Sequence, residues 1–206
     1  MEIKKVAVIG GGAAGFFAAI SVKENHPNHQ VILFEKTSKV LSKVKVSGGG
    51  RCNVTHNCRD ISDLCNAYPR GGKKLKSLFY QFSTNDTIDW FESRGVPLKT
   101  EKDGRVFPVS NNSQSITDCL INEINRLNVK LELGQTIENI EQEKIGWKLK
   151  FKDQPNQNFD AVIIATGGSP KLKGFEWLHN LGHNIIHPIP SLFTFNMPNE
   201  SIIELM

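Results

Sequence analysis

Residues 6–15, VAVIGGGAAG, decide the fold that the sequence predicts. The β-branched run from Ile3 to Ile9 is typical of a short strand, and the small apolar residues from Ala13 to Val22 are typical of a helix. Gln30 to Phe34 again has the composition of a strand. Together these segments predict a βαβ unit at the start of an α/β, Rossmann-like domain.

The glycine string has the spacing G-x-G-x-x-G and lies between a strand and a helix, as dinucleotide-binding loops do. Gly10 allows the tight turn, Gly12 lets the backbone approach a pyrophosphate, and Gly15 removes a side chain where the helix meets the strand. The helix N-terminus would then face the phosphates. The cofactor contacts predicted from this loop are Gly10, Gly11, Gly12, Ala13, Ala14 and Gly15.

An acidic residue follows the second strand, where dinucleotide-binding domains hold a ribose. Glu35 comes about 20 residues after Gly15, and its carboxylate can accept hydrogen bonds from both ribose hydroxyls. The same carboxylate would repel a 2′-phosphate, so the site favours NAD or FAD over NADP. We include the next residue, Lys36, in the predicted site.

The segment after this unit favours FAD over NAD. A lone NAD domain continues into another βα crossover, whereas Thr37 to Arg59 is long, polar and glycine-rich, with little periodicity. Within it, residues 43–53 read KVKVSGGGRCN, and three glycines beside an arginine suit backbone that lies against a flat or phosphorylated ligand. Residues 165–168, ATGG, close an apolar strand, as in the return crossing of FAD enzymes. An NAD-dependent dehydrogenase domain is the alternative.

The rest of the chain predicts a mainly parallel sheet with a β-hairpin and an antiparallel excursion. Helices are expected at Lys73–Phe82, Asp86–Ser93, Ser113–Leu127 and Phe175–Leu181. A hairpin is expected from Val96–Thr100 and Arg105–Val109, because Lys102-Asp103-Gly104 is a turn sequence. Further strands are expected at Val129–Leu133, Thr136–Glu141, Gly146–Phe151, Phe159–Ala165 and Asn184–Ile189. Residues 160–166, DAVIIAT, have the composition of a central strand covered on both faces.

The composition of the chain limits which class of protein it can belong to and which partners it is expected to bind. The 206 residues are 39% hydrophobic and 22% charged, which is typical of a globular protein. The formal net charge is +4, and we interpret the cluster Lys73, Lys74 and Lys76 as a solvated helix face, so no nucleic-acid partner is expected. No apolar run has the length of a membrane span, and the N-terminus lacks the shape of a signal peptide. We expect no membrane partner and a cytoplasmic location.

The cysteines predict neither disulfides nor a metal site. Their spacing, at Cys52, Cys58, Cys65 and Cys119, fits no disulfide framework. Adding His56 does not produce a zinc-binding pattern. We expect free thiols and no metal.

Five blocks of the sequence resemble a known family. They are VIGGGAAG at 8–15, SGGGRCNVT at 47–55, GRVFPVS at 104–110, ATGGSPKL at 165–172 and GHNIIHPIPSL at 182–192. In these blocks the chain resembles the bacterial BaiN-like or aminoacetone-oxidase-like FAD-binding flavoproteins, within the glutathione-reductase-like fold. The resemblance implies a FAD domain over residues 1–190 and the truncated start of an inserted second domain at 191–206, so that the active site would be incomplete in this chain.

The resemblance also implies roles for individual residues. It assigns Gly10, Gly12 and Gly15 to the pyrophosphate and Glu35 to the adenosine ribose. Near the flavin or its pyrophosphate it places Gly49, Gly50, Arg51, Cys52 and Asn53. It puts the backbone of Ile137 at the adenine edge, and Thr166 and Gly167 at the FAD-facing end of the sheet.

The predicted function is a FAD-dependent oxidoreductase that transfers hydride between the flavin and an unidentified small molecule, with NAD(P)H as a candidate electron donor. A FAD-binding fragment without turnover is a further alternative. Arg51 would either stabilise the anionic reduced flavin or clamp a phosphate. We interpret Cys52 as a packed or exposed thiol and His56 as a solvated side chain. No residue is assigned as catalytic.

Overall fold

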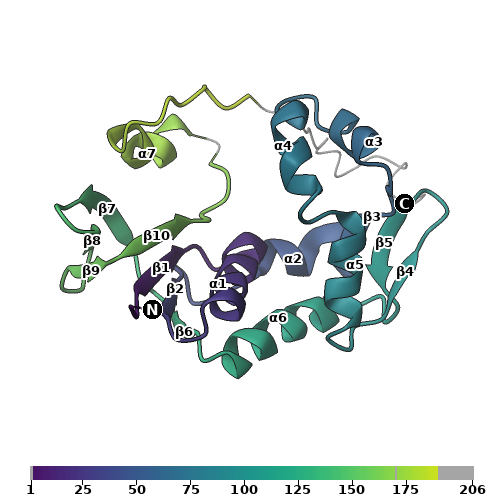
Figure 1. Cartoon of the computed structure of the whole chain (residues 1–206), viewed down its shortest axis with the longest axis horizontal. Helices are drawn as coiled ribbons and strands as arrows, with labels where there is room; N and C mark the ends of the chain where they lie inside the picture. Colours follow the sequence, from purple (N-terminus) through teal and green to yellow (C-terminus); the bar gives the residue numbers. More distant parts are fainter. Residues whose placement is uncertain (1, 170, 190–206) are drawn as a thin grey trace, which may run out of the picture. The chain divides into compact units, whose positions relative to one another are not determined.

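The computed structural model describes residues 2–169 and 171–189, which belong to two compact units, 1–167 and 168–206. The first unit is built on a parallel sheet of four strands in the order β10-β1-β2-β6 (Figure 1). Its strands are β1 (Lys5–Ile9), β2 (Gln30–Phe34), β6 (Lys130–Glu132) and β10 (Ala161–Ile164). In register, Val8 lies between Leu33 on one side and Ile163 on the other. The predicted Rossmann-like α/β class is confirmed.

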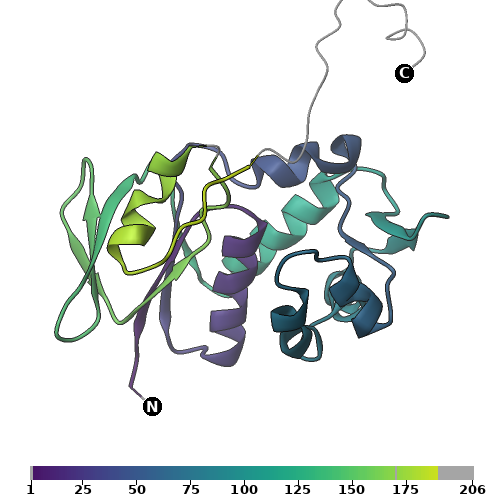
Figure 2. The same cartoon turned by 90° about the horizontal axis from the view of Figure 1, so that it is seen from above.

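Two long helices complete the main core. Helices α1 (Ala13–Asn25) and α6 (Gln114–Arg126) lie side by side (Figure 2) and share one hydrophobic cluster with the strands. Phe16, Ala19 and Ile20 of α1 are fully buried in it. Because Ala19 and Gly15 have little or no side chain, α1 can pack closely on the sheet.

Short helices fill the long connection from β2 to α6. They are α2 (Ser42–Val46), the 3₁₀ turn η1 (Ser47–Gly50), α3 (Ile61–Asn66), α4 (Gly72–Phe79) and α5 (Thr84–Glu92). Ser83 caps α5 in a capping box with Asp86. Arg94, just after α5, pairs with Glu24 of α1 at 2.5 Å and Glu123 of α6 at 3.1 Å, so it joins three helices.

Two antiparallel sheets flank the parallel one. The first has the order β3-β5-β4 and contains β3 (Thr55–His56), β4 (Leu98–Thr100) and β5 (Arg105–Pro108). The second contains β7 (Ile137–Gln142), β8 (Trp147–Phe151) and β9 (Gln157–Phe159) in sequential order. The hairpin predicted around Asp103-Gly104 is therefore confirmed, and so is the antiparallel excursion. The second unit contains the 3₁₀ turn η2 (Leu172–Phe175) and α7 (Glu176–Asn180).

Two sequence expectations are wrong. β10, which was expected to be a central strand, is the edge strand of the four-stranded sheet, and its residues are half-buried throughout. The prediction failed because an apolar run indicates that both faces of a strand are covered, but does not indicate a neighbouring strand on each side. Residues 184–189 form no strand, since apolar residues without a partner ladder do not make one. The segment 37–59, which has little periodicity in the sequence, contains α2, η1 and β3.

Two further points concern the limits of the described residues. The expected domain boundary at 190/191 and the segment 191–206 lie outside them. Among residues 2–169 and 171–189, no helix combines the length and apolarity required to cross a bilayer.

Candidate functional site

The glycine loop after β1 is tightly packed except at Gly12. The Gly10 N–H donates to the Phe34 carbonyl at 2.8 Å, and a Cβ on Gly10 would overlap the Ala165 carbonyl oxygen. A Cβ on Gly15 would overlap the Gly10 carbonyl oxygen. At Gly12, by contrast, no heavy atom of residues 2–169 and 171–189 beyond its own loop and helix lies within 4 Å of the position that a Cβ would take. The protein leaves this space open at the start of α1.

The N-terminus of α1 has backbone donors available for an anion. Gly12 is the N-cap and offers no side chain, and the first turn carries no acidic residue. The first intrahelical bond is donated by Phe16 to Gly12, so the amides before Phe16 have no helical acceptor. Open space in front of free helix amides is the geometry that suits a pyrophosphate.

Glu35 is held beside this loop by hydrogen bonds within the chain. Its Oε2 accepts from the Gly11 N–H at 2.8 Å, and its Oε1 accepts from the Thr37 N–H and hydroxyl, both at 2.9 Å. The Gln135 N–H donates to the Glu35 carbonyl at 2.9 Å, which brings the segment leading into Ile137 to the same place. A carboxylate has four lone-pair sites, so the Glu35 Oε2 can still accept from a ribose hydroxyl. Lys36 is exposed next to it.

The SGGGRC segment has a backbone that only glycine adopts readily. Gly48, Gly49 and Gly50 have φ values of 57°, 67° and 84°, and Cys52 has a φ of 63°. A Cβ on Gly48 would crowd the Phe107 ring, whereas Gly49 and Gly50 face open space. The segment is therefore packed on one side and free on the other.

Hydrogen bonds fix this segment in place. The Ser113 N–H donates to the Gly50 carbonyl and the Ser113 hydroxyl donates to the Lys45 carbonyl, both at 2.9 Å. The Cys52 N–H donates to the Ser47 carbonyl, also at 2.9 Å. The start of α6 thus holds the loop in one conformation, as a ligand-binding backbone requires.

Arg51 is engaged by the β4–β5 hairpin. Its Nη1 lies 2.6 Å from Glu101 Oε1, and its guanidinium lies 4.0 Å from the centroid of the Phe107 ring. A carboxylate of the chain therefore already compensates its charge. This geometry favours a role in holding the loop over either of the two roles expected for Arg51 at the cofactor.

An apolar cavity of about 520 Å³ opens beside both glycine-rich segments. Three aromatic side chains of its wall meet closely, with Phe17 5.0 Å from Phe82 and 5.3 Å from Trp90 between ring centroids. The residues that line it are Ala13, Ala14, Phe17, Lys43, Val44, Ser47, Cys52, Asn53, Val54, Phe82, Thr87, Trp90, Phe91, Ile116 and Leu120. Four of the predicted cofactor residues are among them, namely Ala13, Ala14, Cys52 and Asn53.

Lys43 is the charged residue among those lining this cavity. Its Nζ lies 3.5 Å from the position that a Cβ on Gly167 would take, so the ammonium sits at the end of β10. Sequence reasoning missed Lys43 and the aromatic wall. Lys43 lies one helical turn before the SGGG block. No feature of the sequence distinguishes it from the other lysines, so its role could not be predicted.

The surroundings of Cys52 and His56 do not indicate a reactive role for either side chain. Burial raises the pKa of the Cys52 thiol, against the opposing effect of a hydrogen bond with Ser47, so the thiol stays protonated at neutral pH. His56 Nε2 lies 3.1 Å from the Asp103 carbonyl oxygen, and its ring fills the space over Gly104. The four cysteines are free, as expected. In the described part of the chain, no cluster of three His, Cys, Asp or Glu side chains could hold a metal.

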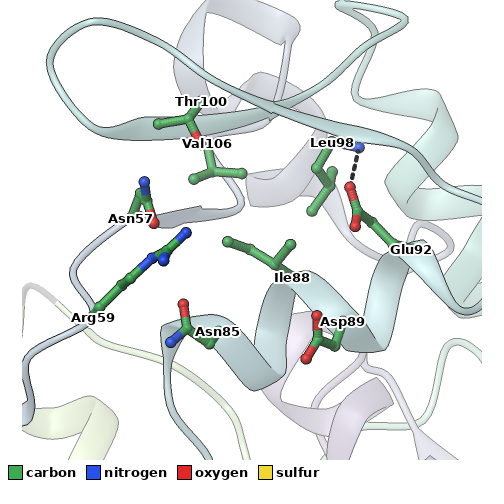
Figure 3. Close-up of a pocket in the computed structure, with 9 residues that line it drawn as sticks. All are labelled: Asn57, Arg59, Asn85, Ile88, Asp89, Glu92, Leu98, Thr100 and Val106. Carbon is green, nitrogen blue, oxygen red and sulfur yellow. Dashed lines mark hydrogen bonds between the residues drawn. The ribbon is translucent and has the colours of Figure 1, made fainter.

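A second cavity, of about 480 Å³, lies between α5 and the sheet β3-β5-β4 (Figure 3). Arg59 and Asn57 face it from one side, and Glu92, which accepts the Leu98 N–H at 3.2 Å, closes the other. None of the predicted cofactor residues lines it. We therefore take the apolar cavity beside the glycine loops as the candidate functional site.

The first prediction concerns Glu35. Replacing Glu35 with alanine should weaken FAD binding about tenfold, because it removes a ribose acceptor and frees the Gly11 amide. Flavin fluorescence titration measures the dissociation constant, and circular dichroism checks the fold. Glu143→Ala, which removes an exposed carboxylate between β7 and β8 and away from the predicted site, is the control. Equal dissociation constants for Glu35→Ala and wild type would contradict the ribose assignment.

Comparison with known proteins identifies the family that the chain resembles. Residues 4–190 match the family model described as the HI0933-like protein Rossmann domain. A 3-dehydro-bile acid delta(4,6)-reductase of Clostridium scindens is 27% identical over 196 residues, which are 92% of this chain and 47% of the relative. A ribosomal RNA dihydrouridine synthase of Escherichia coli is 27% identical over 211 residues, covering 100% of this chain and 51% of the relative.

The chain thus spans about half the length of these curated relatives. Among solved structures, the open conformation of a flavocytochrome c3 fumarate reductase matches with a TM-score of 0.61 at 20% identity, over 88% of this chain and 36% of that one. At this identity the likeness concerns the fold alone. The family match confirms the resemblance that the sequence blocks suggest.

Proposed function

This chain belongs to the HI0933-like family of FAD-binding Rossmann proteins, and we propose that it contributes the FAD site and part of the substrate site of a flavin-dependent reductase. The reductase would add hydrogen across a carbon–carbon double bond conjugated with a carbonyl. The apolar cavity with Lys43 at its edge, beside the pyrophosphate loop, carries this proposal.

The residues of the site fit FAD. The open space at Gly12 and the free amides of α1 suit the pyrophosphate, and Glu35 suits the adenosine ribose. The open faces of Gly49 and Gly50 leave room for a ligand against the backbone. FAD, with NAD(P)H as electron donor, would supply the hydride chemistry when bound.

The chain's own side chains would bind and polarise the substrate. The aromatic wall excludes water and holds an apolar ring system. Addition of hydride to the β-carbon of a conjugated carbonyl places negative charge on the carbonyl oxygen, and a proton then reaches the α-carbon. An ammonium beside the carbonyl oxygen would stabilise such charge, and Lys43, an exposed residue at the edge of the cavity, is the candidate for this role.

The names of the relatives support the reaction class. A delta(4,6)-reductase of a 3-dehydro-bile acid and a dihydrouridine synthase both saturate a double bond conjugated with a carbonyl. The substrates named differ, since one is a small molecule and the other is RNA. Our sequence expectation of no nucleic-acid partner is therefore not supported. We propose the reaction class alone and do not infer the substrate of this chain from the names of its relatives.

The test combines cofactor binding with turnover. Purified protein is loaded with FAD, reduced without oxygen by NAD(P)H or dithionite, and mixed with a conjugated enone or with its saturated ketone. We expect reoxidation by the enone alone, with a product that has gained two hydrogens. Protein that binds no flavin contradicts the FAD site. A bound flavin that only oxygen reoxidises contradicts the reductase and favours a FAD-binding fragment.

We also propose a reducing compartment such as the cytoplasm. Cys58 and Cys65 are half-buried free thiols, and the other two cysteines are buried and free. Free thiols persist where glutathione and thioredoxin keep them reduced.

A further inference from the structure

One segment of the chain contains several cations and no acidic residue. Between Asp63 and Asp86 there is no acidic residue, and the same stretch contains Arg70, Lys73, Lys74 and Lys76. These four cations equal the formal net charge of +4, so the rest of the chain is neutral overall. All four side chains are exposed. In the described part of the chain, no carboxylate forms a salt bridge with any of them.

The same segment exposes aromatic and apolar side chains. Tyr80 is 68% exposed, Leu78 55%, Tyr68 44% and Phe82 38%. Isolated exposed apolar residues need no explanation, but here they flank the four cations on both sides within fifteen residues, with Tyr68 before them and Leu78, Tyr80 and Phe82 after them. We call the exposed surface of residues 68–82 the basic–aromatic surface.

A rigid helical hairpin presents this surface. Helices α3 and α4 lie side by side (Figure 1), and a Cβ on Gly72 would overlap the Cys65 carbonyl oxygen, so the two helices approach as closely as backbone allows. The rings of Tyr68 and Phe79 pack at 5.4 Å between the helices. These contacts hold α3 and α4 against each other.

We propose that the basic–aromatic surface binds single-stranded RNA. Lysine and arginine side chains neutralise backbone phosphates, and exposed aromatic rings stack with unpaired bases, which is how proteins bind single strands without relying on sequence. An acidic peptide would use the cations but not the rings. The surface adjoins the candidate functional site, because Phe82 belongs to both.

This inference concerns a partner and does not depend on FAD binding or on turnover. It replaces our sequence interpretation of Lys73, Lys74 and Lys76 as a merely solvated helix face. That interpretation took the lysines alone, without the exposed rings beside them. The combination of unpaired cations with exposed aromatic side chains carries the inference.

The first experiment measures binding of a fluorescein-labelled oligouridine to the purified chain by anisotropy. The triple variant Lys73→Gln, Lys74→Gln, Lys76→Gln should raise the dissociation constant at least about tenfold, and the slope of log affinity against log salt should fall in magnitude by about 2. The matched control removes three exposed lysines elsewhere, Lys102→Gln, Lys144→Gln and Lys152→Gln. It should change the dissociation constant less than about twofold.

The second experiment isolates the rings. Tyr80→Ala should weaken oligouridine binding about tenfold, whereas Tyr80→Phe, which keeps the ring, should bind as wild type does. Heparin has the charge but no bases, so Tyr80→Ala should leave heparin binding unchanged.

Three results would overturn the proposal. One is equal loss of RNA binding in both lysine triples, and another is full RNA binding by Tyr80→Ala. The third is binding of vesicles that contain phosphatidylserine through Lys73, Lys74 and Lys76 with no binding of oligouridine, which would identify a membrane surface instead. Circular dichroism of every variant checks that the fold is kept.

Discussion

Gly12→Val should lower the affinity for FAD at least about 100-fold and leave the folded structure intact. The φ of Gly12 is −90°, which valine adopts, and in the described part of the chain no heavy atom beyond its own loop and helix lies within 4 Å of the new Cβ. The branched side chain would fill the space in front of the α1 amides, where a pyrophosphate would lie. The expected loss is therefore confined to binding.

Two measurements and a matched variant check this. Flavin retention gives binding, and the thermal unfolding midpoint should shift by less than about 4 °C, which corresponds to roughly 1 kcal/mol or less. Gly15→Val is the contrasting change, because its Cβ would overlap the Gly10 carbonyl oxygen and should destabilise the fold itself. If Gly12→Val remains yellow and loaded with FAD, the glycine string is only a structural turn.

Lys43→Met should lower turnover with a conjugated enone about 100-fold, with little change in FAD affinity. The reason is that a preorganised cation or donor at a developing oxyanion contributes this much to catalysis. Methionine keeps most of the length and apolar bulk of lysine, so the aromatic cavity stays filled to a similar extent. Lys45→Met, two residues along the same helix, is the control, because Lys45 is exposed and does not line the cavity.

The result separates two roles for Lys43. Turnover is measured per bound flavin under saturating FAD, and the dissociation constant of FAD is measured separately. If FAD affinity falls while turnover per bound flavin is unchanged, Lys43 holds a phosphate and our assignment is wrong. Partial recovery of turnover in Lys43→Arg would support a requirement for positive charge.

The fold around the glycine loop could be predicted from the sequence because its constraints are local. The glycine spacing, the strand before it and Glu35 lie within one βαβ unit, and each has a steric or charge reason that a single sequence shows. The register of β1 and β2 and the start of α1 at Ala13 follow from the same stretch.

The cavity could not be predicted in the same way. Phe17 lies in α1, Phe82 in the connection between α4 and α5, and Trp90 in α5, and each has the pattern of an ordinary core residue. Their meeting depends on how α1 and α5 pack, which sequence periodicity does not determine. The position of β10 was missed for a related reason, because apolar composition reports burial on a face and not the order of strands.

Glu101 shows how a distant residue changes the interpretation of a motif. In the sequence Arg51 stands in a glycine-rich block and has no obvious partner. In the structure it is paired with a carboxylate fifty residues further along the chain. Its charge is thus used to hold the hairpin to the loop.

The walls of the apolar cavity come from α1, the segment 43–54, α5 and α6, which are far apart in the chain. Contacts between residues far apart in the chain close long loops, and closing a long loop costs conformational entropy. We therefore expect the contacts between these walls to form late in folding. The parallel strands and α1 can form their local contacts first, whereas the cavity exists only after the long connection has docked. A ligand that bridges these walls binds only the finished state, so occupancy of the cavity would slow unfolding and protect this region from proteases.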